Sequence, residues 1–320
     1  MSASREVTQR VHDKLRRELG PLVCDLLAQD DVIEIILNAD GRLWAERLGQ
    51  PMIAVGTMLP GQAESLMATV ASTIPTTLTR ESPILECELP LDGSRFSAVI
   101  PPVVEAPCFS IRVPAKRIFP LETYRESGII SARQMEILTT AIADRKNILV
   151  SGGTGSGKTT FANAIIDYIA RVTPEHRLAI LEDTRELQCA AKNVLAMRTS
   201  ETAPMDRLLR HALRQRPDRI IVGEVRDRAA LTLLKSWTTG HPGGVATVHS
   251  NVDDPRAALR RLEFLVAEAF TGSAFELIGE AIDVIVTIAK TKEGARRVQG
   301  IASVSGWNGT SYDLEWDQAA

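Results

Sequence analysis

Apolar residues recur with two different spacings along the chain, and the change divides it into two regions. In the first region, Val11, Leu15 and Leu19 lie at the spacing of one helix face, and Pro21 can begin a second helical segment. Turn and strand signals follow. The predicted elements are helix 5–30, strands 31–36 and 43–47, helix 60–74 and a β-rich stretch over 84–113. This pattern predicts a small α+β domain over residues 1–113.

In the second region, apolar strands alternate with amphipathic helices. The predicted strands are 147–151, 177–181, 219–223, 244–248 and 283–289, and the predicted helices are 131–144, one ending near 171, 204–215, 227–239 and 254–270. This alternation predicts an α/β domain over 132–320, a mostly parallel sheet with helices on both faces. Two more strands, near 296–304 and 311–316, predict an antiparallel edge. Residues 114–131, with two prolines and a glycine, predict a linker.

One loop between a predicted strand and a predicted helix indicates phosphate binding. It has the spacing G-x-x-x-x-G-K-[ST], and its glycines let successive backbone N–H groups surround a di- or triphosphate at the positive end of the helix dipole. Lys158 can reach the terminal phosphates, and the Thr159 hydroxyl can hold Mg²⁺. The predicted nucleotide-binding residues are Gly153, Thr154, Gly155, Ser156, Gly157, Lys158, Thr159 and Thr160.

Hydrolysis also needs an acid near the phosphates, and two carboxylates follow apolar strands. Ligands gather at such strand ends in open α/β sheets. Glu224 follows the strand 219–223 and is predicted to activate water, directly or through water bound to Mg²⁺. Glu182 ends the strand before it in sequence and is the second candidate for positioning water or metal.

Two of the five histidines are candidates for the same site. His249 ends the apolar strand 244–248, so we expect it level with Glu224, where its imidazole can bond the γ-phosphate or the acid and report nucleotide state. The same positional argument assigns His241 to the nucleotide. The other three histidines are interpreted as packed or surface residues.

Composition excludes several classes of protein. A 44% hydrophobic and 24% charged chain is typical of a globular protein, and its four cysteines form no zinc or redox motif. No apolar run approaches the ~20 residues that a membrane-spanning helix needs. The N-terminal residues carry no secretory signal, so we expect a cytoplasmic protein, and docking to a membrane-embedded partner stays open.

Four blocks together resemble the secretion ATPase superfamily, which includes type II secretion, type IV pilus and type IV secretion motors. The blocks are 152–160, 181–183, 213–227 and 239–249, similar to its Walker A, Asp box, Walker B and His box. The segment from Gly223 to Asp227 is the most specific. The first region is similar to the N-terminal domain of type IV secretion and conjugation ATPases at 31–38, 44–47, 92–96 and 109–112.

The resemblance implies a RecA-like fold and a hexamer that holds ATP between its two domains and near a neighbouring subunit. Arg95 and Arg112 match the arginines that complete such sites, and Arg226 is a weaker candidate for contacting nucleotide. The family also implies Mg²⁺, channel proteins of the inner membrane as partners, and a peripheral location at its cytoplasmic face. The expected work is assembly of a conjugative pilus or secretion channel, or transfer through it, with 114–131 as the hinge.

Two alternative functions stay open. A hexameric nucleic-acid motor shares this core and predicts a basic channel with aromatic residues, which Arg214, Arg216 and Arg219 can line if they do not lie at a subunit interface. The net charge of −3 and the 4% aromatic content do not favour direct nucleic-acid binding. The other alternative is a scaffold that binds ATP with negligible turnover, which the acids and histidines argue against.

Overall fold

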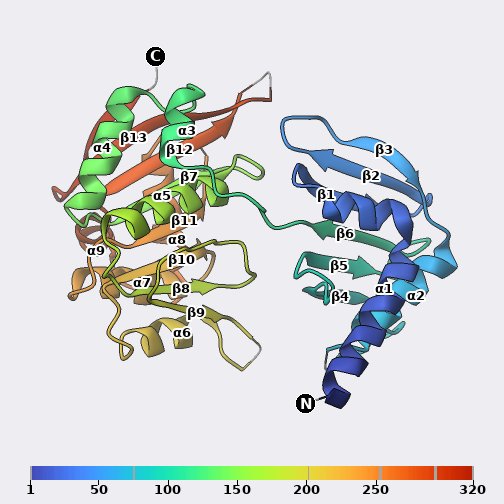
Figure 1. The fold of residues 1–320 in the computed structure, drawn as a ribbon. Helices are drawn as coiled ribbons and strands as arrows, with labels where there is room; N and C mark the ends of the chain where they lie inside the picture. The colour runs from blue at the N-terminus through green and yellow to red at the C-terminus, as the bar shows by residue number, and fades with distance from the viewer. Residues whose placement is uncertain (1, 75, 201, 252–253, 292–293, 319–320) are drawn as a thin grey trace. The chain divides into compact units, whose positions relative to one another are not determined.

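The chain forms two compact units, Met1–Arg117 and Ile118–Ala320, which we call the N-terminal and C-terminal units. The structure is a computed structural model, and it describes residues 2–74, 76–200, 202–251, 254–291 and 294–318. Figure 1 traces the elements of each unit along the chain. No helix within these described ranges is long and apolar enough to cross a membrane.

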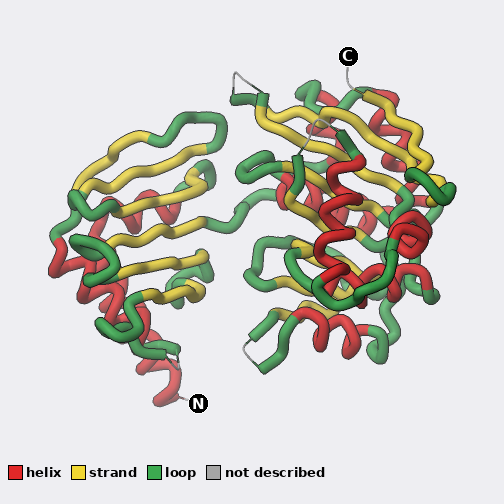
Figure 2. The backbone as a smooth tube through the Cα atoms, turned by 180° about the vertical axis from the view of Figure 1, so that it is seen from behind, coloured by secondary structure: helices red, strands yellow, loops and turns green. Residues whose placement is uncertain are grey.

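The N-terminal unit is a six-stranded antiparallel sheet with two helices packed on one face (Figure 2). Its strand order is β3-β2-β1-β6-β5-β4. Helix α1 changes direction at Gly20, whose φ of 76° suits glycine, and Pro21 then begins the second segment as predicted. Leucines of α1, Leu15 and Leu19, pack with strand residues in one core. The elements are α1 (Ser2–Ala28), β1 (Val32–Leu37), β2 (Arg42–Arg47), β3 (Ile53–Thr57), α2 (Pro60–Ala71), β4 (Ile84–Glu88), β5 (Arg95–Val99) and β6 (Cys108–Arg112).

The C-terminal unit confirms the predicted α/β fold. Its eight-stranded sheet has the order β14-β13-β12-β7-β11-β10-β8-β9, in which β12 through β9 run parallel and β13 and β14 form the predicted antiparallel edge. The strands are β7 (Ile148–Gly152), β8 (Leu178–Glu182), β9 (Val194–Arg198), β10 (Arg219–Val225), β11 (Val245–His249), β12 (Val284–Lys290), β13 (Arg296–Trp307) and β14 (Tyr312–Gln318).

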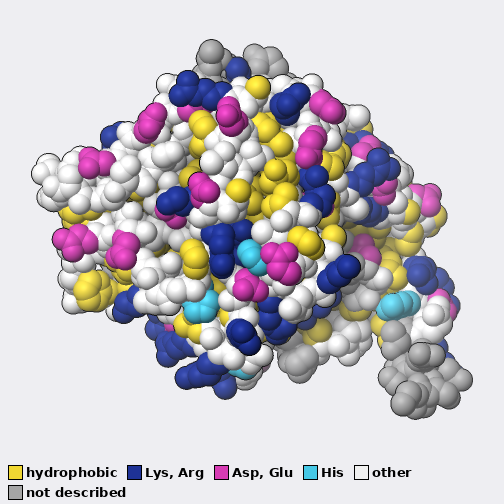
Figure 3. All heavy atoms as spheres, turned by 60° about the vertical axis from the view of Figure 1, so that its left-hand side comes forward, with side chains coloured by type: hydrophobic (Ala, Val, Ile, Leu, Met, Phe, Trp, Pro, Cys, Tyr) yellow, Lys and Arg dark blue, Asp and Glu magenta, His cyan; other side chains and the backbone are white. Residues whose placement is uncertain are grey.

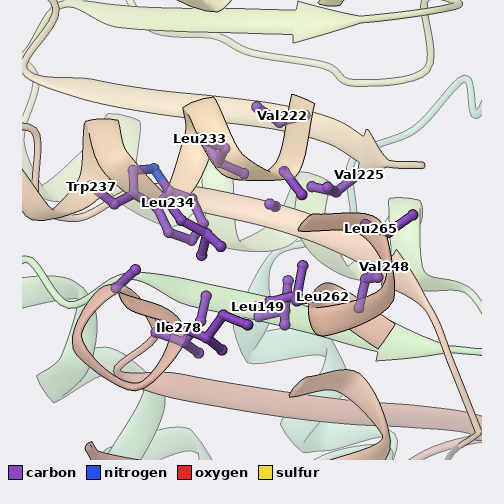
Figure 4. Close-up of a cluster of buried hydrophobic side chains, with 14 of the residues drawn as sticks. Leu149, Val222, Val225, Leu233, Leu234, Trp237, Val248, Leu262, Leu265 and Ile278 are labelled. Carbon is purple, nitrogen blue, oxygen red and sulfur yellow. The ribbon is translucent and has the colours of Figure 1, made fainter. Parts of the chain in front are cut away.

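Helices cover both faces of this sheet because the central strands are apolar on both faces. Helices α3, α4 and α5 pack on one face, and α6, α7, α8 and α9 on the other. Figure 4 shows the core between the sheet and helices α6 to α9. Its side chains point toward one another from strands, as with Val222 and Val248, and from helices, as with Leu233 and Leu262. The helices are α3 (Leu121–Glu126), α4 (Ala132–Ala143), α5 (Lys158–Val172), α6 (Met205–Ala212), α7 (Ala229–Thr238), α8 (Arg256–Ala267) and α9 (Phe275–Ala281).

The predicted linker 114–131 contains regular structure. Residues 113–120 form no helix or strand, but α3 follows, and its Leu121 and Tyr124 are buried in a core of the C-terminal unit. Three other elements, β3, β9 and α9, had no counterpart in the sequence prediction.

Candidate nucleotide site at the strand ends

The glycine loop lies between β7 and α5, as its spacing predicts. Two of its glycines have left-handed backbone angles, with φ of 67° at Gly155 and 93° at Gly157, which residues with a Cβ rarely adopt. A Cβ on Gly153 or Gly155 would meet no atom within 4 Å, so the backbone there faces open space. The loop therefore has the form of a phosphate cradle, and Thr159 and Thr160 follow in the first turn of α5.

Lys158 bridges the loop and the end of β11. Its Nζ donates to the Gly153 carbonyl at 2.9 Å and lies 3.3 Å from Nδ1 of His249. The other ring nitrogen of His249 lies 3.1 Å from Oγ1 of Thr154. His249 therefore lies beside the loop, within contact distance of two of its residues.

Charged side chains from three strand ends continue this arrangement. His249 Nδ1 lies 3.5 Å from Oε1 of Glu224, and Arg226 Nε donates to Oε2 of Glu224 at 2.7 Å. Arg226 also lies 3.8 Å from Asp183. The chain of contacts runs Lys158, His249, Glu224, Arg226, Asp183. We call these five residues the strand-end network.

One nitrogen of this network serves two contacts that exclude each other. Nδ1 of His249 must carry a lone pair to accept from Lys158, but it must carry a proton to donate to Glu224. The Thr154 hydroxyl can accept from Nε2 or donate to it, so it accommodates both tautomers. Movement of Lys158 toward a phosphate would therefore free His249 to bond Glu224.

Glu182 is held by the loop that follows it. It is 6% exposed, and its Oε1 accepts from the backbone N–H groups of Glu186 at 2.9 Å and Leu187 at 2.6 Å. Burial raises the pKa of this carboxyl despite those two bonds. A Cβ on Gly223 would lie 3.0 Å from Cγ of Glu182, so a side chain before Glu224 would press on this carboxyl.

Sequence reasoning missed a third acid, Glu186. Its Oε2 accepts from the Thr159 hydroxyl at 3.3 Å, and Asn163 of α5 donates to its carbonyl at 3.2 Å. The only sequence signal was its position four residues after Glu182, which no periodicity distinguishes in a loop. The hollow beside it has an empty volume of about 330 Å³ that includes open solvent, and it is lined by Thr159, Glu182, Asp183, Thr184, Glu186, Gly223, Glu224 and Arg226.

This hollow fits Mg²⁺ that is held partly by phosphate and water. Among the described residues no three His, Cys, Asp or Glu side chains converge as a metal cage. Mg²⁺ usually takes one or two protein oxygens beside phosphates and waters. The Thr159 hydroxyl beside Glu186, with Glu224 lining the same hollow, supplies oxygens of that kind.

The structure places His241 elsewhere, so the positional argument for it is wrong. It precedes β11, where Gly244 N donates to Asn147 and Ile148 N donates to Gly244. These residues begin strands whose other ends carry the loop and His249. Because β7 and β11 are parallel, His241 lies at the amino-terminal ends of the strands, and Lys158 lies at their carboxyl-terminal ends.

Arg219 is also misplaced in the sequence interpretation. It is 0% exposed, so it cannot line a pore, whereas Arg214 and Arg216 are exposed.

The candidate arginines of the N-terminal unit lie opposite each other: Arg95 on β5 and Arg112 on β6 are direct cross-strand partners. Acids occupy the neighbouring register positions, with Glu88 opposite Arg95 and Glu34 opposite Arg112.

Comparison with known proteins gives consistent relatives. Residues 21–299 match the family described as "Type II/IV secretion system protein". The probable conjugal transfer protein TrbB of Sinorhizobium fredii is 50% identical over 309 residues, 97% of this chain and 94% of that protein. The type IV secretion system protein PtlH of Bordetella pertussis is 32% identical over 85% of this chain and 89% of that one.

A solved structure shares the fold. The ATPase DotB of Legionella pneumophila superposes with a TM-score of 0.60 at 19% identity, covering 85% of this chain and 77% of that chain.

Proposed function

The chain belongs to the type II/IV secretion ATPase family, and on that premise we propose that it hydrolyses ATP to power conjugative transfer. ATP hydrolysis drives assembly of a conjugative pilus or type IV secretion channel, or movement of DNA or protein through that channel. The name of the TrbB relative in S. fredii supports the conjugative role. Partners of this motor are channel proteins of the inner membrane, so we place it at the cytoplasmic face.

The strand-end network beside an open phosphate cradle carries this proposal. Lys158 binds the terminal phosphates, and Glu224 takes a proton from the attacking water. Arg226 holds one oxygen of Glu224, and His249 bonds the other once Lys158 has moved to the phosphate, so that both orient this base. Glu182 fixes the loop that carries Glu186, through its two backbone bonds.

Mg²⁺ completes the site in this proposal. Thr159 would hold it, with Glu224 acting through water and Glu186 as a further oxygen. When bound, the ion neutralises charge that develops on the phosphate oxygens. The protein's part is to keep the Thr159 hydroxyl turned toward that position.

A hexamer would bring Arg95 and Arg112 to the phosphates of a bound nucleotide. These two arginines occupy directly opposite strand positions, so one phosphate can contact both guanidinium groups. Binding of ATP then draws the N-terminal unit toward the nucleotide, and loss of phosphate releases it. The hinge of this movement lies within the predicted linker 114–131.

The test is ATP turnover by single-residue variants. Lys158→Ala removes the charge that contacts the terminal phosphates, and Glu224→Gln removes the base while keeping its shape. We expect each to lower kcat by about 100-fold or more. Phosphate release at saturating ATP and Mg²⁺ measures this.

Matched controls lie on exposed helix positions of the same unit. Glu136→Gln on α4 and Lys235→Ala on α7 should retain wild-type turnover, because neither lies near the loop. Wild-type turnover by both Lys158→Ala and Glu224→Gln would show that this site does not hydrolyse ATP.

A further inference from the structure

Arg296, the first residue of β13, lies directly against the glycine loop. A Cβ built on Gly157 would lie 2.8 Å from Cδ of Arg296 and 3.1 Å from its Nε. Contacts this short mean that a side chain at Gly157 would displace the end of the Arg296 side chain. The stem of Arg296 therefore packs on the backbone at the point where α5 begins.

The guanidinium of Arg296 is available to a ligand. Its Nε is buried, and none of the other described residues accepts a hydrogen bond or forms an ion pair with this side chain. Tyr124 of α3 is close by: its pKa is raised by burial, and the Arg296 charge opposes that rise. Tyr124 is 5% exposed and packs edge-on against Phe161 of α5, so the surroundings of Arg296 are firmly held.

The order of strands indicates which part of a nucleotide faces Arg296. The loop leaves β7, and the strands that carry the acids and His249 (β11, β10 and β8) follow on one side of it. On the other side lie β12 and β13, as the labels of Figure 1 show. Since the γ-phosphate is the group that is hydrolysed, we expect it to lie beside the acids. A nucleotide extended across the loop thus directs its nucleoside end toward β13.

We propose that Arg296 binds the nucleoside monophosphate end of ATP. Its N–H groups reach the α-phosphate and its planar guanidinium packs on the ribose and base, as arginine does with other π systems. This inference rests on the proposed function, because it takes the glycine loop as the ATP site. It assigns to the antiparallel edge of the sheet a part in recognising nucleotide.

Binding of two probes separates the two ends of the nucleotide. ADP has the nucleoside end, and pyrophosphate has only the part that the loop surrounds. We expect Arg296→Gln to raise the Kd for ADP about 10-fold and to leave the Kd for pyrophosphate within about two-fold of the wild-type value. Calorimetry measures both constants without turnover. Arg297→Gln is the matched control, because Arg297 is exposed and points to the other side of β13. It should bind both probes as wild type does.

Each other outcome overturns the inference in a distinct way. Unchanged ADP binding would show that Arg296 makes no contact. Equal weakening of both probes would show that the substitution disturbs the loop, and Arg296→Lys, which keeps the stem against Gly157 and the charge, checks this with a thermal melt. If wild type binds neither probe, the proposed function fails and this inference with it.

Discussion

Arg219 is a buried cation that forms no ion pair with a described carboxylate. Its Nη1 donates to the Gly243 carbonyl and its Nη2 to the Ile142 carbonyl, both at 3.0 Å, and its Nε donates to Nδ1 of His176 at 3.2 Å. Three acceptors thus compensate the burial of its charge. The arrangement requires that Nδ1 of His176 be unprotonated, so one residue fixes the protonation state of another.

This requirement predicts acid sensitivity of the C-terminal unit. Burial, followed by the charges of Arg219 and Arg145, lowers the pKa of His176, against the opposing charges of Asp218 and Glu175. As the pH falls, His176 therefore takes up a proton in the unfolded chain before it does so in the folded protein, at about the ordinary pKa of 6.5. The contribution of neutral His176 to the free energy of unfolding is complete above pH 6.5 and is lost as the pH falls below it. Between pH 7.5 and 5.5 the loss should reach up to about 1 kcal/mol.

Urea unfolding at the two pH values measures this loss. His176→Gln should lower stability at both values but remove this part of the pH dependence. His211→Gln, at an exposed position, should keep the wild-type difference. An identical difference in His176→Gln and wild type would contradict the assignment.

At the residue scale, sequence patterns located side chains that end apolar strands. Glu224 and His249 were predictable because a buried parallel strand carries its next residue to the ligand edge. His241 was misplaced, because a loop that precedes a strand resembles one that follows it in residue type. Glu186 could not be found, since its place beside Thr159 depends on how Glu182 folds the intervening loop.

At the scale of elements, short edge structure was the hardest to predict. Strand β9 owes its form to parallel pairing with β8, as at Glu182 and Arg198, and its own alternation is weak. Helix α9 has only seven residues, too few for a clear helical period. The central strands were predictable because their apolar runs are continuous.

The connection between the units is fastened at both ends. Lys116 Nζ donates to the Leu27 carbonyl at 2.5 Å and to the Gln29 carbonyl at 2.8 Å, and Arg117 donates twice to Asp30. On the other side, Leu121 and Tyr124 of α3 are buried in the core of the C-terminal unit. We therefore expect the hinge of the proposed movement to be residues 118–120.

Removing the contact between Arg117 and Asp30 should make the connection between the units more accessible to protease. Asp30→Ala removes the acceptor of Arg117, an exposed pair whose loss costs about 0.2–1 kcal/mol. Trypsin cleavage after Lys116 and Arg117 should then accelerate about two- to four-fold, followed by mass spectrometry. Asp13→Ala, which breaks an exposed pair on α1, should not change it. Equal rates in all three proteins would place the hinge elsewhere.

At the scale of the whole molecule, charge supports a protein motor over a nucleic-acid motor. On the face that Figure 3 shows, basic, acidic and apolar side chains are interspersed, and no continuous basic field covers it. The net charge of the chain is −3. The face shown does not supply the extended positive groove that a nucleic-acid channel needs.

A mixing experiment tests whether active sites are shared between subunits. One protein carries Glu224→Gln with intact arginines, and the other carries Arg95→Ala and Arg112→Ala with an intact loop. If arginines act across subunits, a mixture should hydrolyse ATP several-fold faster than the sum of the separate proteins. Arg42→Ala, at an exposed position of β2 in the same unit, in place of the two arginine substitutions is the control. Activity that only adds, or a particle mass of a monomer with and without ATP analogue, would contradict the shared site.

The fastened connection also limits the kind of movement open to this protein. Between the anchors Arg117 and Leu121 lie only three residues, of which Phe119 packs partly against the core of the C-terminal unit, and four Cα-to-Cα steps span at most about 15 Å. These anchors can therefore never part by more than that span, whatever nucleotide is bound. A tether so short permits swivelling but little travel, so we expect the force-producing stroke to be a rotation about a nearly fixed point.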